Sequence, residues 1–176
     1  MNRNMTRRLL LLSLCLGLAA CDSSDTAPLP LNLYEGDAGE TALRHLISSL
    51  PDINPGVAKS YSIVLGEINR DGMTPATDEF TKRFADLKLK FINAQNLKDI
   101  EPDHTIADPD TRLAAFVLQL RSLKPTSAKT WDVEVGWSYK KEFARMKVHL
   151  EVKDGKTTVV SAEKIEGSAA VTPAVK

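Results

Sequence analysis

The chain has 176 residues and carries 23 lysines and arginines, 23 aspartates and glutamates, and three histidines. This length allows one ordinary domain with a hydrophobic core, and the lack of a basic block argues against a nucleic-acid partner. No GxGxxG, P-loop, HExxH, GxSxG or paired-cysteine zinc spacing occurs, so no motif nominates a cofactor, a metal ion or a catalytic nucleophile.

The first twenty residues have the order of a bacterial export signal. Arg3, Arg7 and Arg8 precede an apolar run over residues 9–18, and small residues follow it. A run of about ten residues is too short to cross a bilayer, which needs roughly twenty. Residues 18–21, Leu-Ala-Ala-Cys, resemble the lipobox of bacterial lipoproteins. The alternative is an ordinary secretory peptide that is cut after Ala20 and leaves Cys21 as a free thiol.

The lipobox resemblance implies that Cys21 is the first residue of the mature protein and carries a diacylglycerol on its sulfur, commonly with a third acyl chain on its amine. Two or more acyl chains hold a protein stably on a bilayer, so the expected location is the periplasmic side of a bacterial cell membrane. In enterobacterial lipoproteins, Asp after the lipidated Cys marks retention in the inner membrane, the role implied for Asp22. Because Cys15 lies in the leader, no thiol remains for disulfides, metal binding or catalysis.

The mature chain has a slightly acidic body. Removing the three leader arginines leaves 20 basic against 23 acidic residues, a net charge of −3. This net charge argues against nucleic acid as a binding partner. It also argues against electrostatic adhesion to anionic lipid as the main membrane attachment. Residues 21–36 have the composition of a flexible tether with a reach of roughly 20 Å. Within it, Leu29, Leu31 and Leu33 alternate like a short strand at a sheet edge, although the neighbouring prolines favour an extended connector.

Three helices are predicted after the tether. The first begins at Asp37, has a capping box with Glu40 and ends at Pro51. The second opens at Asn54-Pro55 and ends at Asp71-Gly72. The third, shorter helix opens at Thr74-Pro75. Their apolar stripes, in chain order, are Ala42, Leu43, Leu46, Ile47 and Leu50; Val57, Tyr61, Val64, Leu65 and Ile68; and Phe80, Phe84 and Leu87.

The apolar period then changes from near 3.6 to 2, which predicts strands. Leu89 and Phe91 give a short first strand, and residues 113–120 are apolar on both faces, as in a central strand. Residues 131–139 and 146–152 alternate between apolar and polar side chains. Asp154-Gly155 predicts a tight hairpin turn into residues 157–165. Residues 167–176 are small and irregular and predict a loose tail.

This order predicts a single α+β domain over residues 37–166, with N-terminal helices followed by a curved antiparallel sheet of about four strands. The element order and the closing hairpin of residues 150–156 resemble nuclear-transport-factor-2-like folds, in which a curved sheet wraps around helices to form a cone. Cystatin-like domains share much of this plan. The resemblance covers residues 38–166.

Trp131, Trp137 and Tyr139 form the strongest aromatic feature, on one face of the predicted strand over residues 131–139. They form either the hydrophobic wall of the sheet that faces the helices, or the lining of a ligand pocket or partner surface. Gly136 between them supports some curvature. The opposite face carries charges of both signs and is typical of a solvated surface.

The segment over residues 99–110 is acidic, but it lacks the alternating oxygen ligands and the glycine of a calcium loop. Asp108-Pro109-Asp110 is typical of a turn capped by aspartate. The same two aspartates are candidate contacts for a basic protein partner.

The histidines do not form a metal site. His45 lies on the first predicted helix, His104 in the acidic segment and His149 on the polar face of a strand, and each is interpreted as structural or solvated. In cone-fold enzymes an acid and a His or Tyr often act in a cavity, which makes His45 with Tyr61 the candidate pair. Core packing is the favoured interpretation of Tyr61.

The favoured function is a membrane-anchored, non-catalytic lipoprotein whose extracytoplasmic domain binds a protein or a small ligand, without a cofactor. Two alternatives stay open. One is a periplasmic inhibitor or immunity-type protein that uses the acidic segment, and the other is a small cone-fold hydrolase or isomerase.

Overall fold

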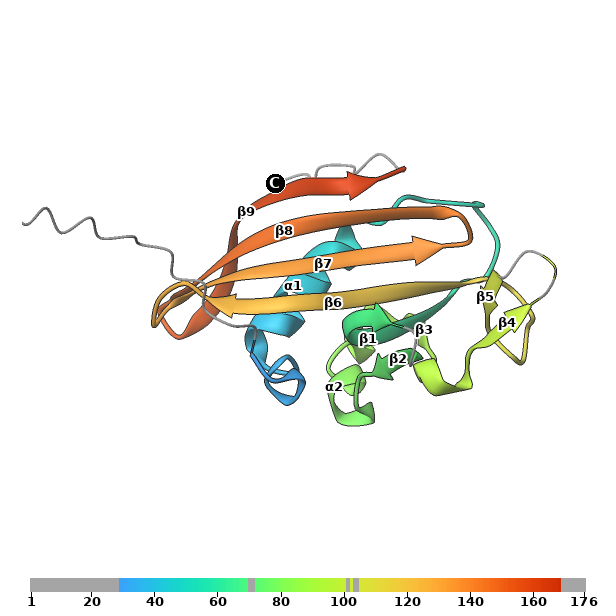
Figure 1. The fold of residues 1–176 in the computed structure, drawn as a ribbon, viewed down its shortest axis with the longest axis horizontal. Coiled ribbons are helices and arrows are strands. Elements are labelled where there is room, and N and C mark those ends of the chain that lie inside the picture. Colours follow the sequence, from blue (N-terminus) through green and yellow to red (C-terminus); the bar gives the residue numbers. More distant parts are fainter. Residues whose placement is uncertain (1–28, 70–71, 101, 103–104, 169–176) are drawn as a thin grey trace, which may run out of the picture.

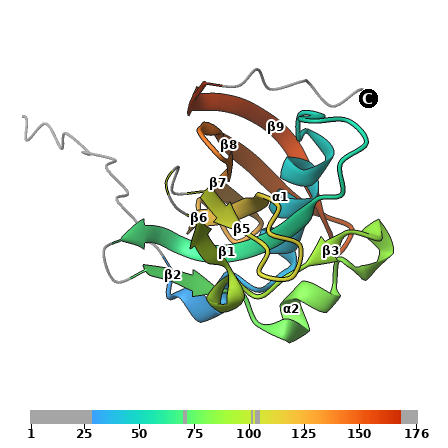
Figure 2. The same ribbon diagram turned by 90° about the vertical axis from the view of Figure 1, so that its right-hand side faces the viewer.

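One helix lies against one face of a large, mostly antiparallel sheet in the computed structural model of this chain (Figure 1). The structure describes residues 29–69, 72–100, 102 and 105–168. The helix α1 (Asp37–Ser48) contacts the last four strands of the chain, and the sheet curves around it when seen end-on (Figure 2). The prediction of an α+β domain is confirmed at this level.

The main sheet has seven strands among the described residues, more than the four predicted. The strands follow the order β2-β1-β6-β7-β8-β9, and β3 pairs with β1. β1 runs parallel to β3 and β6, and the other neighbours are antiparallel. Their bounds are β1 (Ser60–Asn69), β2 (Gly72–Pro75), β3 (Lys90–Phe91), β6 (Ala115–Pro125), β7 (Thr130–Tyr139), β8 (Glu142–Lys153) and β9 (Lys156–Gly167).

Smaller elements fill the segment between β2 and β6. The helix α2 covers Asp78–Lys82, and β4 (Lys98–Ile100) pairs with β5 (Thr105–Ala107) in a separate two-stranded sheet. Short 3₁₀ helices cover Ala85–Leu87 and Ala94–Asn96 in this segment, and another covers Leu31–Leu33 before α1. Because strands and helices are interleaved here, the predicted order of all helices before all strands is wrong.

The second predicted helix is wrong, because residues 60–69 form β1. Tyr61, Ile63 and Leu65 pack in the main core under α1, while Val64 packs in a smaller cluster on the other side of the sheet. The run Ile63-Val64-Leu65 is therefore buried on both faces, and such a run fits a helix and a strand equally well by periodicity. Its β-branched residues favour the strand.

The third predicted helix starts later than expected. Thr74 and Pro75 belong to β2, and α2 begins after Thr77, whose hydroxyl accepts a hydrogen bond from the Phe80 amide at 3.2 Å. Phe80 and Phe84 are fully buried, as the sequence predicts, and their rings meet edge to face.

The predicted helix at α1 and the predicted C-terminal strands are confirmed. The predicted capping box of Asp37 and Glu40 is wrong, because the N-cap of α1 is Gly36, no side-chain cap hydrogen bond forms, and Glu40 pairs with Arg44 at 2.8 Å. Ala42, Leu43 and Leu46 of α1 are buried in the main core. β7, β8 and β9 form two successive hairpins, and the second turns at Asp154-Gly155. Both turn residues have positive φ, 52° and 74°, as expected for the tight turn that suits the twist of a hairpin.

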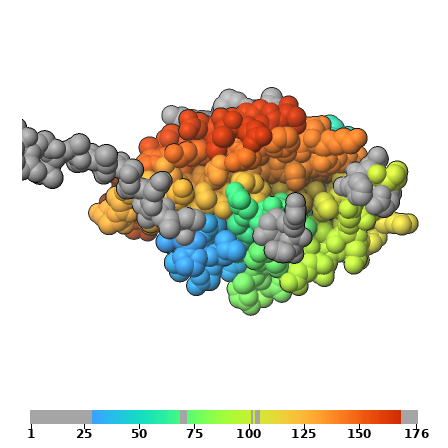
Figure 3. Space-filling model, in the orientation of Figure 1, coloured from blue at the N-terminus to red at the C-terminus, as the bar shows by residue number. Residues whose placement is uncertain are grey.

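The first described residues pack on the domain, although the sequence predicts them as tether. Tyr34 is only 2 % exposed, Leu29 packs against the main core, and the Leu29 amide lies 3.5 Å from the Leu123 carbonyl oxygen. These residues, blue in Figure 3, lie directly against the rest of the domain. The leader, Cys21, Asp22 and the tail beyond Ser168 lie outside the described residues. No helix in the described part of the chain is long and apolar enough to cross a membrane.

The sheet face away from α1 carries a row of ion pairs across five strands. Glu67 of β1 pairs with Arg121 of β6 at 2.9 Å, and Arg121 lies 4.0 Å from Glu134 of β7. Glu134 also pairs with Arg145 of β8 at 2.9 Å, and Arg145 pairs with Glu166 of β9 at 2.7 Å. Opposite charges on neighbouring strands support the sheet register.

β9 is an edge strand, and its ladder with β8 is irregular. Leu150 pairs with Val159 and His149 with Ser161, which leaves Val160 as a bulge. A second register shift leaves Ile165 unpaired in the same way. Both bulged side chains are exposed.

We expect Gly39→Ala to destabilise the domain by about 1–3 kcal/mol, because the added methyl group would overlap the Tyr34 carbonyl and crowd Leu120. This exceeds the gain of about 1 kcal/mol that alanine normally brings to a helix. Urea unfolding measures the effect. Gly36→Ala is the control, because its nearest atom is 3.8 Å away, and equal stability of the two variants would contradict the predicted contact.

Candidate ligand-binding site at the β7–β8 turn

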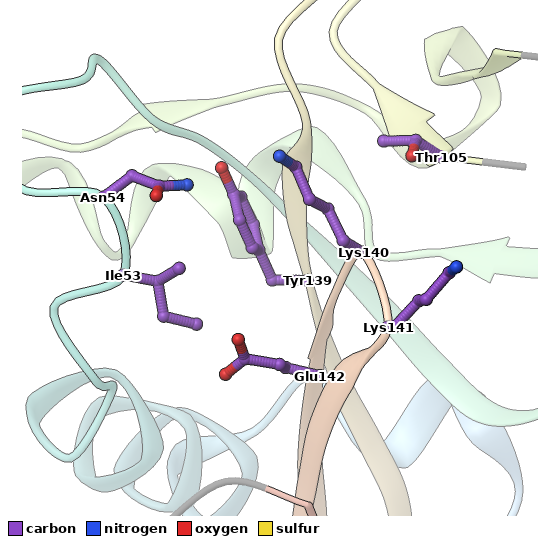
Figure 4. A pocket seen from close by; sticks show the side chains of 7 residues that line it. All are labelled: Ile53, Asn54, Thr105, Tyr139, Lys140, Lys141 and Glu142. Atoms are coloured by element: carbon purple, nitrogen blue, oxygen red, sulfur yellow. The ribbon is translucent and has the colours of Figure 1, made fainter. Parts of the chain in front are cut away.

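The β7–β8 turn forms one wall of a surface pocket. Lys140 and Lys141 connect Tyr139, the last residue of β7, to Glu142, the first of β8. A pocket of about 310 Å³ lies between this turn and two other segments. These are the coil after α1, with Ile53 and Asn54, and Thr105 of β5 (Figure 4).

A second pocket of about 390 Å³ adjoins the first, because both are lined by Asn54, Thr105, Tyr139 and Lys140. Together they are called the β7–β8 pocket. The second part adds Val57, Ile100, Arg112, Leu113 and Ala114. These volumes reach the lower end of the range for small-molecule sites.

Polar groups converge on one side of the β7–β8 pocket. The Tyr139 hydroxyl points toward the Asn54 side chain, while Lys141 points away from Tyr139 (Figure 4). The Lys140 Nζ atom lies 5.8 Å from the centre of the Tyr139 ring. Neither Lys140 nor Arg112 forms an ion pair with any residue that the structure describes. Two cations, an amide and a hydroxyl are therefore free to bind an anionic group.

Apolar side chains also line the second part of the β7–β8 pocket. Val57 is 42 % exposed and Leu113 is 39 % exposed, and Ile100 is half-buried beside them. Large apolar side chains beside unpaired cations form an amphipathic surface, suited to a ligand that carries an apolar body next to a negative group.

The backbone around the pocket is unusual. Asn54, Arg112 and Lys140 have φ values of 54°, 59° and 55°, in the left-handed region. They are three of the five non-glycine residues with positive φ in the described ranges. For Arg and Lys this conformation costs about 1–2 kcal/mol each, and such costs gather at binding sites. The three residues come from three separate segments, so the strain is concentrated around the β7–β8 pocket.

The predicted aromatic site is mostly core. Trp137 and Tyr139 are buried, and Trp131 is half-buried against the main core. Phe116 stacks on Tyr139 with ring centres 4.5 Å apart and on Tyr61 at 5.5 Å. The interpretation as the wall of the sheet therefore holds for this group, and among the three residues of the predicted site Tyr139 alone lines the β7–β8 pocket.

Asp108 is no surface residue, which corrects its prediction as a partner contact. Its side chain is fully buried and accepts hydrogen bonds from Ser60 Oγ and Lys90 Nζ, both at 2.7 Å. It also accepts a bond from the Asp110 amide at 2.9 Å, so the predicted capped turn is present. The Lys90 ammonium and then the Ser60 hydroxyl hold the pKa of Asp108 well below its usual range. Asp110, in contrast, is 82 % exposed.

The candidate acid–base residues are dispersed. Tyr61 stacks on Phe116 and meets the Phe91 ring at a tilted angle, and burial raises the pKa of its hydroxyl. His45 is half-buried on α1, and burial lowers its pKa. No hydrogen bond joins these two residues, both of which the structure describes. His104 lies outside the described residues.

His149 lies on the sheet face away from α1. Its Nδ1 atom is 2.8 Å from Asp132 Oδ1, and Lys147 Nζ is 2.8 Å from Asp132 Oδ2. Burial alone would raise the pKa of Asp132, but hydrogen bonds from Lys147 and His149 outweigh it and hold the pKa below its usual value. Ser161 stands opposite His149 in the strand register without a hydrogen bond to the ring. Asp132, Lys147 and His149 thus belong to the ion-paired surface of this sheet face.

Sequence reasoning missed the β7–β8 pocket. Asn54 is predicted only as a helix cap, and Arg112 and Lys140 carry no motif. One feature of the sequence could have indicated it. Lys140-Lys141 lies between two alternating strands, at the place of a two-residue turn that normally contains glycine.

No group of three or more His, Cys, Asp or Glu residues is placed to hold a metal ion in the described part of the chain. No protein-family model, no curated protein and no solved structure matches the chain.

We expect Asp108→Asn to destabilise the domain by about 2 kcal/mol at neutral pH, because the Lys90 and Ser60 donors lose a charged acceptor. The folded-state pKa of Asp108 is lowered, so its contribution is present above the unfolded pKa of about 3.9 and fades as pH falls below it. The stability difference between wild type and variant, measured by urea unfolding, should narrow in acid. Asp110→Asn is the exposed control; an effect as large as that of Asp108→Asn would contradict this assignment.

Proposed function

We propose that this chain is a membrane-anchored bacterial lipoprotein whose extracytoplasmic domain binds a small ligand in the β7–β8 pocket. The ligand carries one anionic group beside an apolar body. The observation that carries the proposal is the lining of the pocket, which combines exposed Val57 and Leu113 with Arg112 and Lys140, two cations that form no ion pair with a described residue.

The chemistry of the lining selects this ligand class. A carboxylate, phosphate or sulfonate could accept charge-assisted hydrogen bonds from Arg112 and Lys140, which are stronger than bonds between neutral groups. Asn54 and Tyr139 offer further donors at the same side. Glu142 at the edge would repel a second negative charge, which favours a single anionic group.

The membrane anchor rests on the lipobox resemblance of residues 18–21, with Cys21 as the acylated residue and Asp22 as the signal for the inner membrane. Since Leu29 already packs on the domain, the proposed tether is residues 22–28. It is shorter than the tether predicted from the sequence, and it holds the domain close to the bilayer.

We also propose that the curved sheet with α1 is related in plan to the cone of nuclear-transport-factor-2-like or cystatin-like domains. The curvature of the sheet around α1 (Figure 2) supports this proposal. The position of the β7–β8 pocket at the end of the sheet, beside the coil that leaves α1, also supports it.

The two other functions have less support. An inhibitor that uses the acidic segment would have Asp110 available, while Asp108 is committed to Ser60 and Lys90. A cone-fold enzyme would need an acid and a His or Tyr that act together in one cavity. Among the described residues that line the β7–β8 pocket these are Glu142 and Tyr139, but no hydrogen bond joins them and the Tyr139 hydroxyl points toward Asn54 (Figure 4).

Naphthalene sulfonate and naphthalene methanol test the pocket, because they share an apolar body and differ in charge. We expect the sulfonate to bind more tightly to the protein in neutral nanodiscs. Arg112→Gln and Lys140→Gln should each raise its Kd roughly tenfold and leave the alcohol unchanged. Calorimetric titration measures both.

The matched control is Lys88→Gln, because Lys88 is an exposed lysine with nearly the same φ as Lys140 but lies away from the pocket. Equal affinities for the two compounds, or equal effects of Lys88→Gln and Lys140→Gln, would refute the proposed site.

The anchor is tested separately. We expect Cys21→Ser to abolish incorporation of labelled fatty acid and to block lipoprotein processing, because serine has no sulfur to accept the diacylglycerol. Mass spectrometry of the membrane fraction gives the readout, and continued acylation would show that the lipobox interpretation is wrong.

A further inference from the structure

Four exposed lysines gather at the end of the sheet opposite the β7–β8 pocket. Lys124 is the second-last residue of β6, Lys129 lies in the β6–β7 turn, and Lys153 and Lys156 flank the β8–β9 turn. The two turns are neighbours, because the Val152 amide donates a 2.7 Å hydrogen bond to the Lys129 carbonyl oxygen. This set of four is called the lysine end. Its members are scattered in the sequence, so it forms no basic block there.

The charges at the lysine end are unbalanced. None of the four lysines forms an ion pair with another described residue. The nearby acids are exposed Glu151 and Asp154, and Asp132, which stands opposite Lys124 in the strand register but is paired with Lys147. With Lys147 counted beside the four lysines, five cations face three acids, which leaves a surplus of two positive charges. On the sheet face away from α1, in contrast, Arg121 and Arg145 are each paired with glutamates.

The chain enters the domain at this same end. Leu29 lies next to Leu123, one residue before Lys124. Seven residues, and thus eight Cα–Cα steps, separate Leu29 from Cys21. They span at most about 28 Å when extended and about 16 Å as a flexible coil. An acylated Cys21 would therefore keep the lysine end near the bilayer.

The β7–β8 pocket lies at the other end of the long axis. Ala115 begins β6 beside the pocket and Leu123 lies near its end, a separation of about 26 Å along the strand. Figure 1 shows the β7–β8 turn and the β8–β9 turn at opposite ends of the sheet.

We propose that the lysine end binds the anionic headgroups of the membrane that holds Cys21, so that the domain stands with the β7–β8 pocket facing away from the bilayer. This inference rests on the proposed lipid anchor. A lysine at an anionic surface strengthens attachment roughly fivefold, within a screening length of about 8 Å at physiological salt. The net negative charge of the mature chain does not oppose this, because only charges that close to the surface count. The anchor supplies the attachment, and the lysines set the orientation.

Energy transfer from the domain to a headgroup dye tests the orientation. The acylated full-length product has no free thiol once Cys15 is removed and Cys21 is modified, so an introduced cysteine is labelled uniquely. Ala128→Cys labels the lysine end, and Glu142→Cys labels the far end. The protein is reconstituted in phosphatidylcholine vesicles with or without phosphatidylglycerol.

We expect stronger transfer from position 128 than from position 142, with a larger difference when phosphatidylglycerol is present. Replacing Lys124, Lys129, Lys153 and Lys156 with Gln should abolish that increase. The control replaces Lys82, Lys88, Lys98 and Lys141 with Gln, which changes the net charge equally and should preserve the increase. Glu151→Gln with Asp154→Asn should enlarge it.

Vesicle flotation separates the two possible failures. A protein that floats with the vesicles but shows equal transfer from both positions, or no response to phosphatidylglycerol or to the lysine replacements, overturns the proposed orientation alone. A protein without fatty acid on Cys21 that fails to float overturns the anchor and this inference with it.

Discussion

The burial of β6 between β1 and β7 is the constraint on which the rest of the domain depends. Its residues 115–120 are buried on both faces, with Phe116, Leu118 and Leu120 in the core under α1 and Val117 in the smaller cluster behind. A strand covered on both faces has a fixed register, because a shift by one residue would exchange the two apolar sets. Because β6 is fixed, the β7–β8 pocket beside its first residues and the lysine end beside its last residues stay at opposite ends of the sheet.

Sequence patterns predict this fold where one face of an element is solvated. The alternation of residues 131–139 and 146–152, the Asp154-Gly155 turn and the stripe of α1 all correspond to the structure. The pattern failed at β1, because Ile63, Val64 and Leu65 are buried on both faces and Val57 and Ile68 happen to extend a helical spacing. The pocket and the lysine end were not predictable, since each is assembled from loops whose spatial proximity depends on strand pairing.

Charge is distributed by function as well as by stability. Arginines on the sheet face away from α1 are paired across strands, and Lys90 is paired with buried Asp108. The cations without partners in the described chain include Arg112 and Lys140 at one end and the four lysines at the other. Unpaired cations contribute little to folding, and these two groups are the basis of the two proposed binding surfaces. Two such clusters on one rigid sheet suit a module that binds at one end and is held at the other.

The two bulges of β9 affect how readily neighbouring molecules can pair through this edge strand. An edge strand of 12 residues offers a row of backbone groups to which another chain can add, and regular edges of this kind promote aggregation. Val160 and Ile165 interrupt that row and increase the local twist. Copies anchored in one membrane diffuse in two dimensions and collide edge to edge far more often than free copies do. With the proposed anchor at Cys21, the two irregularities would limit such strand pairing between neighbouring copies in the membrane and leave both ends of each molecule accessible.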